Sequence, residues 1–430
     1  MAEGYAEVDI HFEPSYSDSC SSAHFFQLAH TRIHDDNAVI HLALQYNTLA
    51  MKELLVFSSD YPPNDGGIAR LCSEIAGGWA RAGAAVQVIA PAPRKGIAKP
   101  RSLTDELRVR HSRPWREWES YRALRKRIGL GPTVCGLWYP DGLLAQIACA
   151  RPRIILAHGL ELMPTESRWR REIWRWMLKW VCESADLVIA NSEFTRKLVL
   201  ESAPGANVLA IPLAVDYRRF APGDAQGAKR RFGVANKVVL STVSRLDSYK
   251  GHDVVFRAIA ASSERIRRNL VYLIAGRGPH QAELERQVTE LGLTDQVRFL
   301  GFVPEDDLPD LYRASDLSLL CSREVVERQQ VEGFGLVILE AQSCGTPVIG
   351  TRTGGIPDAV KEGEGGWLIE QDDTAALSSF LSRLVDDPSA FLAEGRRARN
   401  RVERQCTWEH YMQQFVAALE SLGMPEERAK

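Results

Sequence analysis

The sequence predicts an α/β protein with two doubly wound, Rossmann-like domains that face a cleft. Short apolar runs alternate with helix-like segments along most of the chain, which is typical of parallel sheets covered by helices on both faces. The alternation forms two series, separated by a turn-rich stretch at residues 215–227. The length agrees, since 430 residues exceed what one hydrophobic core usually serves.

The first series opens with LLVFSS at residues 54–59, and a helix expected over Ile68 to Arg81 ends at Gly83. Its further strands are expected in AVQVIAP (85–91), RIILAHG (153–159), ADLVIANS (185–192) and NVLAIPLAV (207–215). The second series predicts strands in KVVLSTVSR (237–245), VYLIAG (271–276), VRFLGFV (297–303), LSLLCS (317–322) and PVIGT (347–351). Helices are expected between them near 253–261, 281–291 and 306–314, and in a segment ending at Gly345.

These series divide the chain into four parts. Residues 51–215 are expected to form the first domain and residues 216–400 the second, and residues 401–430 form a separate C-terminal part. Residues 1–50 show no strand–helix unit, and two explanations stay open: an extension that is disordered or partly helical, or a translation start that truly lies at Met51.

Composition excludes several classes of protein. Lys and Arg number 53 against 55 Asp and Glu, a net charge of -2, so nucleic acid is not an expected partner. No uncharged apolar run reaches the ~18 residues of a membrane span, and no secretory signal is visible. Eight scattered cysteines without a CxxC pair favour reduced thiols, so we expect a cytoplasmic protein.

Ligands of doubly wound sheets bind at the carboxyl ends of the strands, so the turns after the strands are the places to search. After VVLSTV, Arg245 and Lys250 offer two cations suited to a diphosphate, although surface cations are common in such loops. Gly276 and Gly278 after the next strand are too few for a dinucleotide fingerprint, because Gln281 stands where that pattern needs a third small residue. The two glycines alone favour a tight strand–helix connection.

The strongest signal is Glu332-Gly-Phe-Gly-Leu-Val-Ile-Leu-Glu340. Phe334, Gly335 and Leu336 open a helix there, and its free N–H groups suit anionic oxygens. Glu340 lies in an otherwise apolar stretch, where an ionised carboxylate needs a partner. We expect the two carboxylates to accept hydrogen bonds from hydroxyl groups on different parts of one extended ligand.

The first series contributes two weaker signals. Asp65-Gly66-Gly67 follows the first strand and could hold a phosphate oxygen or leave room for a sugar. His158 follows RIILA, where it could bind a sugar hydroxyl or be an ordinary histidine at a strand end. Taken alone, the second explanation is favoured.

Taken together, these residues resemble the family 4 retaining glycosyltransferases, which have the GT-B architecture of two Rossmann-like domains. The most specific element is the E-x7-E motif from Glu332 to Glu340. Further segments follow in the family's order from Met51 to about residue 420: YPPNDGGIAR, ANSEFTRK, the Arg245/Lys250 pair, AGRGP, VRFLGFV and EAQSCGTPVIGTRTGGIPDAV. One departure is the longer segment at residues 323–330.

The resemblance implies that residues 51–215 are the acceptor-side domain, that residues 216–400 bind the donor nucleotide, and that a helix in residues 401–430 crosses back to the first domain. It also implies a role for each matching residue. Arg245 and Lys250 would bind the donor diphosphate, and Glu332 would hold hydroxyls of the transferred sugar beside His158. Glu340 would bind the ribose hydroxyls. The remaining donor contacts would come from Gly66, Gly67, Gly276, Val303, Phe334, Gly335 and Leu336, with the backbone at Phe302 and Val303 lining the nucleobase.

The implied reaction is retaining transfer of a hexosyl unit from a UDP- or GDP-linked sugar to a hydroxyl acceptor, without a cofactor or a divalent metal. Glycolipid, lipopolysaccharide or exopolysaccharide biosynthesis is the expected setting, with a lipid-linked or glycan acceptor. Two alternatives stay open: a non-catalytic protein of this fold that binds sugar nucleotides, and a GT-B sugar-nucleotide epimerase.

Two segments of the first series are basic and aromatic. Residues 101–130 hold nine Lys/Arg against four Asp/Glu, with Trp115, Trp118 and Tyr121 interleaved, and we expect peripheral contact there with the inner face of the cell membrane. Residues 166–182 hold four tryptophans, of which Trp169, Trp176 and Trp180 share one helical stripe with Ile173. We expect this second stripe to pack in the domain core.

Overall fold

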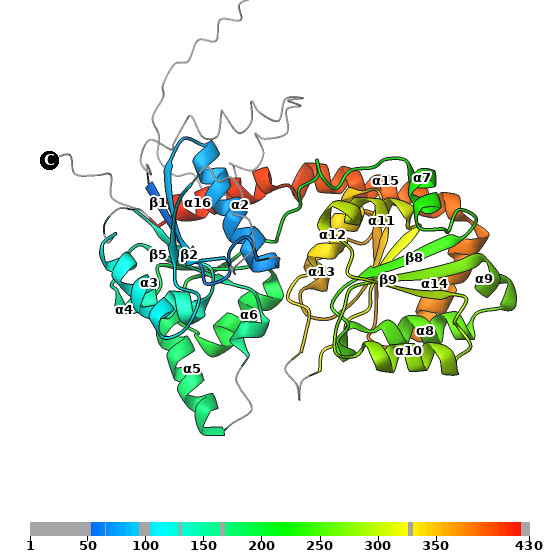
Figure 1. Ribbon diagram of the computed structural model, residues 1–430, viewed down its shortest axis with the longest axis horizontal. Helices are drawn as coiled ribbons and strands as arrows, with labels where there is room; N and C mark the ends of the chain where they lie inside the picture. The colour runs from blue at the N-terminus through cyan, green and yellow to red at the C-terminus, as the bar shows by residue number, and fades with distance from the viewer. Residues whose placement is uncertain are drawn as a thin grey trace, which may run out of the picture. The chain divides into compact units, whose positions relative to one another are not determined.

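Two fully parallel sheets form the framework of the protein, each flanked by helices (Figure 1). The structure is a computed structural model that describes residues 53–64, 66–93, 104–127, 129, 131–163, 168–325 and 330–422, with side chains left aside at 168 and 169. The strand orders are β3-β2-β1-β4-β5-β6-β7 and β10-β9-β8-β11-β12-β13. Both orders are doubly wound, so the predicted fold class is confirmed.

The first sheet and its helices are called the first lobe here. Its strands are β1 (Glu53–Phe57), β2 (Ala85–Pro91), β3 (Asp105–Val109), β4 (Thr133–Cys135), β5 (Arg153–Ala157), β6 (Leu187–Ala190) and β7 (Val208–Ala210). The helical segments are α2 (Gly67–Arg81), α3 (Trp115–Arg125), η2 (Trp138–Gly142), α4 (Leu143–Ile147), η3 (Leu160–Leu162), α5 (Arg168–Glu183) and α6 (Glu193–Ser202).

The second sheet and its helices form the second lobe. Its strands are β8 (Val238–Val243), β9 (Leu270–Ala275), β10 (Val297–Gly301), β11 (Leu317–Leu320), β12 (Val348–Thr351) and β13 (Gly366–Ile369). The helical segments are α7 (Ala225–Arg231), η4 (Ser248–Lys250), α8 (His252–Ala261), α9 (Glu264–Asn269), α10 (Gln281–Glu290), η5 (Glu305–Asp307), α11 (Leu308–Ala314), α12 (Leu336–Ser343), α13 (Ile356–Ala359), α14 (Thr374–Asp386) and α15 (Pro388–Gln405).

Alternation along the strands explains why both faces of each sheet are covered. In β1, Leu54 and Val56 belong to one apolar core, and Leu55 and Phe57 belong to another. All four side chains are at most 6% exposed. Successive side chains of a strand point to opposite faces, so a run of apolar residues must be buried on both sides.

The last helix, α16 (Trp408–Glu420), packs on α2 of the first lobe. The ring of Phe415 meets Trp79 edge to face with centroids 6.0 Å apart. Thr407 begins the helix, because its side chain accepts a hydrogen bond from the backbone N–H of His410. Figure 1 shows α15 and α16 following one another along the top of the view.

The structure corrects the expectation that the tryptophan stripe of residues 166–182 lies in the core. Ile173, Trp176 and Trp180 of α5 are 55%, 66% and 39% exposed. The buried face of the helix is formed instead by Trp174, which packs against Trp138, and by Leu178 and Val181 further along the same face. The fourth member of the expected stripe, Trp169, lies outside the described side chains.

Two further expectations concern covalent and membrane chemistry. Within the described residues, the seven cysteines from Cys72 to Cys406 are free thiols, as expected. Among the helices in this part of the chain, none combines the length and the apolar character needed to cross a bilayer. Residues 1–50, for which two explanations stayed open, lie outside the described residues.

Candidate active site

The second sheet reverses its winding between β8 and β11, which are hydrogen-bonded neighbours although they are far apart in sequence. The loops that follow these two strands therefore leave the sheet side by side and in opposite directions, which is where such folds bind ligands. The first loop carries Arg245 and Lys250, and the second leads to Glu332. All described residues belong to one compact unit, and the two lobes contact each other within it.

Lys250 and Glu332 form an ion pair across these loops. The Lys250 Nζ lies 2.5 Å from the Glu332 Oε2, and the two side chains are 11% and 18% exposed. Burial opposes the charge on the ammonium, but the Glu332 carboxylate and the Tyr249 hydroxyl together hold the pKa of Lys250 above its usual value. Lys250 is therefore a fixed positive charge at the switch point.

Arg245 is placed differently from Lys250. Its side chain is 76% exposed, and its guanidinium lies 3.3 Å from Asp247 Oδ2 in the same loop. An exposed pair of this kind contributes little to stability, so the guanidinium can turn to an anionic ligand at small cost. The structure thus separates the two predicted cations into one that is fixed and one that is adaptable.

The glycine-rich opening of α12 lies beside Glu332, since a Cβ on Gly335 would lie 3.7 Å from Glu332 Cγ. Gly335 has φ +92°, in the left-handed region that favours glycine, and a Cβ there would lie 2.9 Å from Leu320 Cδ2. Leu336 is the first helical residue, so its N–H has no acceptor within the helix. Positive charge from these N–H groups adds to that of Lys250.

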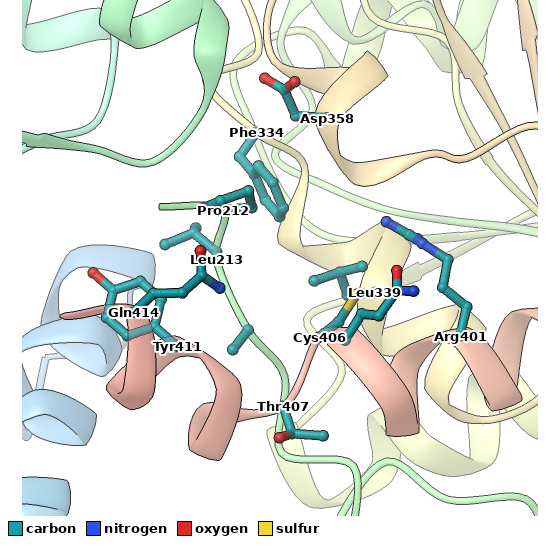
Figure 2. A pocket seen from close by; sticks show the side chains of 12 residues that line it. Pro212, Leu213, Phe334, Leu339, Asp358, Arg401, Cys406, Thr407, Tyr411 and Gln414 are labelled. Atoms are coloured by element: carbon teal, nitrogen blue, oxygen red, sulfur yellow. The ribbon is translucent and has the colours of Figure 1, made fainter. Parts of the chain in front are cut away.

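Phe334 anchors this turn through its side chain. The ring is 3% exposed and lines a cavity of about 100 Å³ together with residues 212–214 and residues of α15 and α16. Figure 2 shows the ring beside Pro212, with Tyr411 and Gln414 on one side and Arg401 on the other. Ligand pockets usually measure ~300–1,000 Å³, so this cavity is too small for a sugar nucleotide. Only the backbone of Phe334 is left for the predicted ligand contact.

Glu340 is buried in the second turn of α12 and has the partner that the sequence required. Its Oε1 accepts a hydrogen bond from Arg70 Nη1 at 2.8 Å, and its Oε2 accepts one from the Tyr312 hydroxyl at 2.9 Å. Burial raises the pKa of Glu340, and Arg70 opposes that rise. The carboxylate is therefore already engaged on both oxygens.

Arg70 belongs to α2 of the first lobe and bridges to a second acid. Its Nη2 lies 2.6 Å from Glu305 Oε1 in the segment that follows β10. Burial would raise the pKa of Glu305, but Arg70 and Arg219 hold it below the usual value. Arg70 thus ties the start of α2 to both α12 and the loop after β10.

His158 follows β5 of the first lobe and lies directly against the E-x7-E loop. A Cβ on Gly333 would lie 2.2 Å from the His158 carbonyl oxygen, so only glycine permits this approach of the two backbones. The His158 Nε2 lies 2.8 Å from the carbonyl oxygen of Gly136. Since a carbonyl only accepts, Nε2 carries the proton in the neutral ring and Nδ1 is left as an acceptor.

Ser192 connects the same two loops from the other side. Its hydroxyl donates to the Gly333 carbonyl at 2.8 Å and accepts a hydrogen bond from the Thr195 N–H, which caps α6. Asn191 donates to the His158 carbonyl at 3.1 Å. The ends of β5 and β6 therefore hold the turn that contains Glu332.

The predicted donor-binding glycines fall into two groups. Gly276 has φ +138°, and a Cβ there would lie 1.8 Å from the Ser244 carbonyl oxygen, so loop packing already explains this glycine. Gly66 is the N-cap of α2, and the Cβ position of Gly67, the first helical residue, has no atom within 4 Å. Nothing in the fold therefore requires glycine at Gly67. Asp65, the residue before them, lies outside the described residues.

Val303 follows β10 and packs partly buried against the core, while its neighbour Phe302 is 60% exposed. The loop that contains both leads to Glu305 and hence to Arg70. The longer segment at 323–330 is described only at Arg323, Glu324, Val325 and Gln330. There, Arg323 pairs with Asp253 at 2.5 Å and with Asp372 at 2.7 Å.

Three contributors were missed by the sequence analysis: Arg70, Ser192 and Tyr312. Arg70 ends the YPPNDGGIAR segment and Ser192 lies in ANSEFTRK, so both were within segments already quoted without a role. Ser192 had a readable signal, since a serine before a helical run is a preferred cap. Among the described residues, no cluster of three or more His, Cys, Asp and Glu side chains is arranged to hold a metal ion.

Two family models match the chain and cover most of it. Residues 65–219 match Glycosyltransferase Family 4, and residues 228–404 match Glycosyl transferases group 1. The GDP-mannose-dependent alpha-(1-6)-phosphatidylinositol monomannoside mannosyltransferase of Mycolicibacterium smegmatis is 32% identical over 60% of this chain and 67% of its own length. The chain belongs to the family 4 glycosyltransferases.

A second relative matches over less of its length. The D-inositol 3-phosphate glycosyltransferase of Saccharomonospora viridis is 36% identical over 52% of this chain, and the chain spans about half (53%) of that relative. Among solved structures, sucrose-phosphate synthase from Thermosynechococcus elongatus has a TM-score of 0.73 at 22% identity over 86% of this chain and 99% of its own. Anabaena HepE in complex with UDP has a TM-score of 0.70 at 21% identity, over 86% and 100%. These two structures share the GT-B fold.

Proposed function

We propose that the protein is a retaining glycosyltransferase that moves a hexosyl unit from a UDP- or GDP-linked sugar to a hydroxyl acceptor. The observation that carries the proposal is the buried Lys250–Glu332 ion pair at the switch point of the second sheet. It lies beside the N-terminus of α12, and the first lobe brings His158 to the same loop. A cation, a carboxylate and helix N–H groups are what a sugar diphosphate requires.

The diphosphate binds to the cationic side of this arrangement. Lys250 provides the fixed charge, Arg245 swings from Asp247 to the phosphates, and the N–H groups at Gly335 and Leu336 donate to phosphate oxygens. From the first lobe, Gly66 and Gly67 let the backbone at the start of α2 approach the diphosphate.

The transferred sugar binds between Glu332 and His158. Glu332 accepts hydrogen bonds from sugar hydroxyls while it stays paired with Lys250. The His158 Nδ1 is a further acceptor for a sugar hydroxyl, because Nε2 is already used by the Gly136 carbonyl. The two groups reach the sugar from different lobes.

Glu340 binds the ribose hydroxyls, and the backbone near Val303 lines the nucleobase. Because Glu340 is only 4% exposed and holds Arg70, the ribose can reach it only when the Arg70 contact opens. Donor binding is therefore coupled to a movement of α2.

In the transfer step, the bond between the anomeric carbon and the leaving phosphate oxygen breaks, and a bond to the acceptor oxygen forms on the same face of the sugar. The acceptor's proton passes to the departing diphosphate, which becomes basic as it gains charge. Lys250 and Arg245 stabilise that charge, and fixed donors of this kind typically contribute 10²–10³ to a rate. Glu332 is a ligand of the sugar, not a nucleophile.

We also propose that no cofactor or divalent metal is needed, because Lys250, Arg245 and the N-terminus of α12 supply the positive charge. Transfer at full rate in the presence of a chelator is the expected result. A rate that depends on added Mg²⁺ or Mn²⁺ would contradict this part of the proposal.

The names of the relatives suggest where to begin the search for substrates. One name gives GDP-mannose as donor, and the acceptors named are a phosphatidylinositol mannoside and inositol 3-phosphate. A lipid-linked or glycan acceptor at the inner face of the cell membrane fits the basic aromatic segment at 101–130, where Trp115 and Trp118 are 52% and 50% exposed. Residues 101–103, 128 and 130 of that segment lie outside the described residues.

A donor panel tests the proposal. Purified protein is given UDP- and GDP-linked hexoses with and without hydroxyl acceptors, and nucleotide release and the anomeric configuration of the product are measured. We expect slow release without acceptor and faster release with one, and retention at the anomeric carbon. Binding without any release would favour the non-catalytic alternative, and inversion would exclude the proposed step.

A further inference from the structure

Helix α5 of the first lobe presents an apolar face to solvent. Ile173, Trp176 and Trp180 occupy positions i, i+3 and i+7, so they share one stripe along the helix. Trp176 and Trp180 are stacked, with ring centroids 6.0 Å apart and an angle of 11° between the planes. These three side chains are called the α5 stripe here. Single exposed apolar residues are normal, but two stacked indoles beside an isoleucine form a patch.

The fold does not need the α5 stripe, because another face of α5 already packs against the first lobe. Trp174 lies 4.4 Å from Trp138 and 5.4 Å from Tyr139 between ring centroids. Leu178 and Val181 are at most 1% exposed. The stripe can therefore be altered without disturbing the core.

Positive charge accompanies the stripe. Helix α5 carries five Lys/Arg against two Glu. The side chains of Arg175 and Lys179 are 55% and 54% exposed, and their contacts to Glu172 and Glu183 are loose, at 3.3 Å and 4.0 Å. Exposed pairs of this kind are easily exchanged for other anions.

Helix α3 repeats the same combination. Trp115 and Trp118 are about half exposed, and the guanidinium groups of Arg110 and Arg122 lie over their rings at 5.5 Å and 4.6 Å. The start of α3 is linked to the inner side of α5, because Arg113 lies over the ring of Tyr139. Two helices of the first lobe, both in contact with Tyr139 directly or through the chain that precedes them, thus expose indole rings beside cations.

We propose that the α5 stripe is a docking surface for an anionic lipid bilayer, with the indoles in the headgroup region and Arg175 and Lys179 on the lipid phosphates. Exposed tryptophan beside excess positive charge is the combination that membrane interfaces favour. A second copy of the chain fits less well. The stripe offers at most about 400 Å² by the usual size of these side chains, against ~800 Å² per partner in a stable dimer.

The position of α5 in the fold gives this docking a use. In a βαβ unit the helix runs antiparallel to the strands, so the first turns of α5 lie near the carboxyl ends of the strands, where His158 follows β5. One end of α5 projects away from its neighbours in Figure 1. This inference extends the membrane contact proposed above, and it rests on the proposed function only for the identity of the acceptor as lipid-linked.

Vesicle sedimentation of the full chain tests the proposal. Vesicles of phosphatidylcholine with and without phosphatidylglycerol are compared for the wild type, Trp176→Ser/Trp180→Ser and Arg175→Gln/Lys179→Gln. Leu392→Ser is the matched control, because Leu392 is 60% exposed on α15 of the second lobe. We expect binding to the anionic vesicles that falls about tenfold or more in the tryptophan variant. The charge variant should lose the preference for phosphatidylglycerol, and the control should bind like the wild type.

Three results would overturn the proposal: no binding by the wild type, unchanged binding by Trp176→Ser/Trp180→Ser, or a dimer in sedimentation velocity that this variant abolishes. Circular dichroism establishes that each variant is folded. Nucleotide binding is measured on the same samples and should not change. Vesicle binding without nucleotide binding would refute the proposed function but not the docking surface. Nucleotide binding without vesicle binding would refute the docking surface but not the proposed function.

Discussion

The two lobes contribute to the candidate site in different ways. The second lobe supplies charged side chains that are fixed by each other, above all Lys250 and Glu332. The first lobe supplies mainly close backbone approaches and capping groups, such as the His158 carbonyl against Gly333 and the Ser192 hydroxyl. The charged side chains of the site are therefore already paired with each other before any ligand binds, whereas contacts from the first lobe determine how closely the two lobes meet.

The same contrast appears in two buried carboxyl groups. Glu340 of the second lobe is paired with Arg70. Asp141 of the first lobe is fully buried and accepts the Ser59 N–H, at 3.1 Å to both oxygens. Burial raises the pKa of Asp141 to about 7. Of these two carboxyl groups, only Glu340, at the contact between the lobes, forms an ion pair in the described residues.

Replacing the fixed cation should have the largest effect. Lys250→Ala is expected to lower the rate of nucleotide release by about 10²–10³, because the departing diphosphate loses its fixed positive charge. The control is Lys361→Ala, an exposed lysine of the same lobe, which should leave the rate unchanged. Circular dichroism should show both variants folded, and wild-type turnover in Lys250→Ala would remove the leaving-group role.

Breaking the bridge between the lobes should be next in size. Arg70→Ala is expected to lower the free energy of unfolding by about 3 kcal/mol, because it leaves the buried Glu340 without its cation. The double variant Arg70→Met/Glu340→Met should recover most of that loss, since no buried charge is left unpaired. Denaturant titration measures the free energy of unfolding of both variants and of Glu340→Met. If the loss in the double variant equals the sum of the losses in the two single variants, Arg70 and Glu340 are not a direct pair.

The glycine at the start of α2 separates a ligand role from a structural role. Gly67→Ala should raise the free energy of unfolding by about 0.5 kcal/mol, because the added methyl meets nothing and restricts the unfolded chain. The same change should reduce donor turnover about tenfold, if the diphosphate lies against this backbone. Gly77→Ala in the middle of α2 is the control and should keep wild-type turnover. Unchanged turnover in Gly67→Ala would place the diphosphate elsewhere.

The smallest expected effect is a pH dependence that belongs to the first lobe. The pKa of Asp141 is raised in the folded protein, so its contribution to stability is present below about pH 4 and is lost as the pH rises toward 7. Asp141→Asn removes this titration and keeps an oxygen acceptor for Ser59. Between pH 5 and 8 the melting temperature of the wild type should fall by about 2–4 °C more than that of the variant. Parallel melting curves would show that Asp141 is ionised throughout.

The sequence predicted the fold class and most of the central strands. The strands that it missed were β3, β4 and β13. β3 reads DELRV, which is too polar to stand out, β4 is only three residues long, and β13 starts with a glycine and lies at the sheet edge. Strands of this kind depend on their neighbours in the sheet, and that information is not local.

The residues of the candidate site could be predicted where the signal lies within one loop. They could not be predicted where two segments that are distant in sequence meet. The E-x7-E motif showed that Glu340 needs a partner, but nothing in the sequence identified Arg70, 270 positions away, as that partner. The tryptophans of α5 were misjudged for a related reason. Two opposite faces of that helix carry indoles, and periodicity alone does not say which face packs on the sheet.

Calorimetry of nucleotide binding tests the central claim most directly. GDP and UDP are titrated into the wild type and Lys250→Ala, and the corresponding monophosphates serve as ligands without the second phosphate. The account predicts that a diphosphate binds the wild type, and that the variant loses about tenfold or more in affinity for the diphosphate and little for the monophosphate. Equal diphosphate affinity in both proteins, or no binding to either, would contradict it.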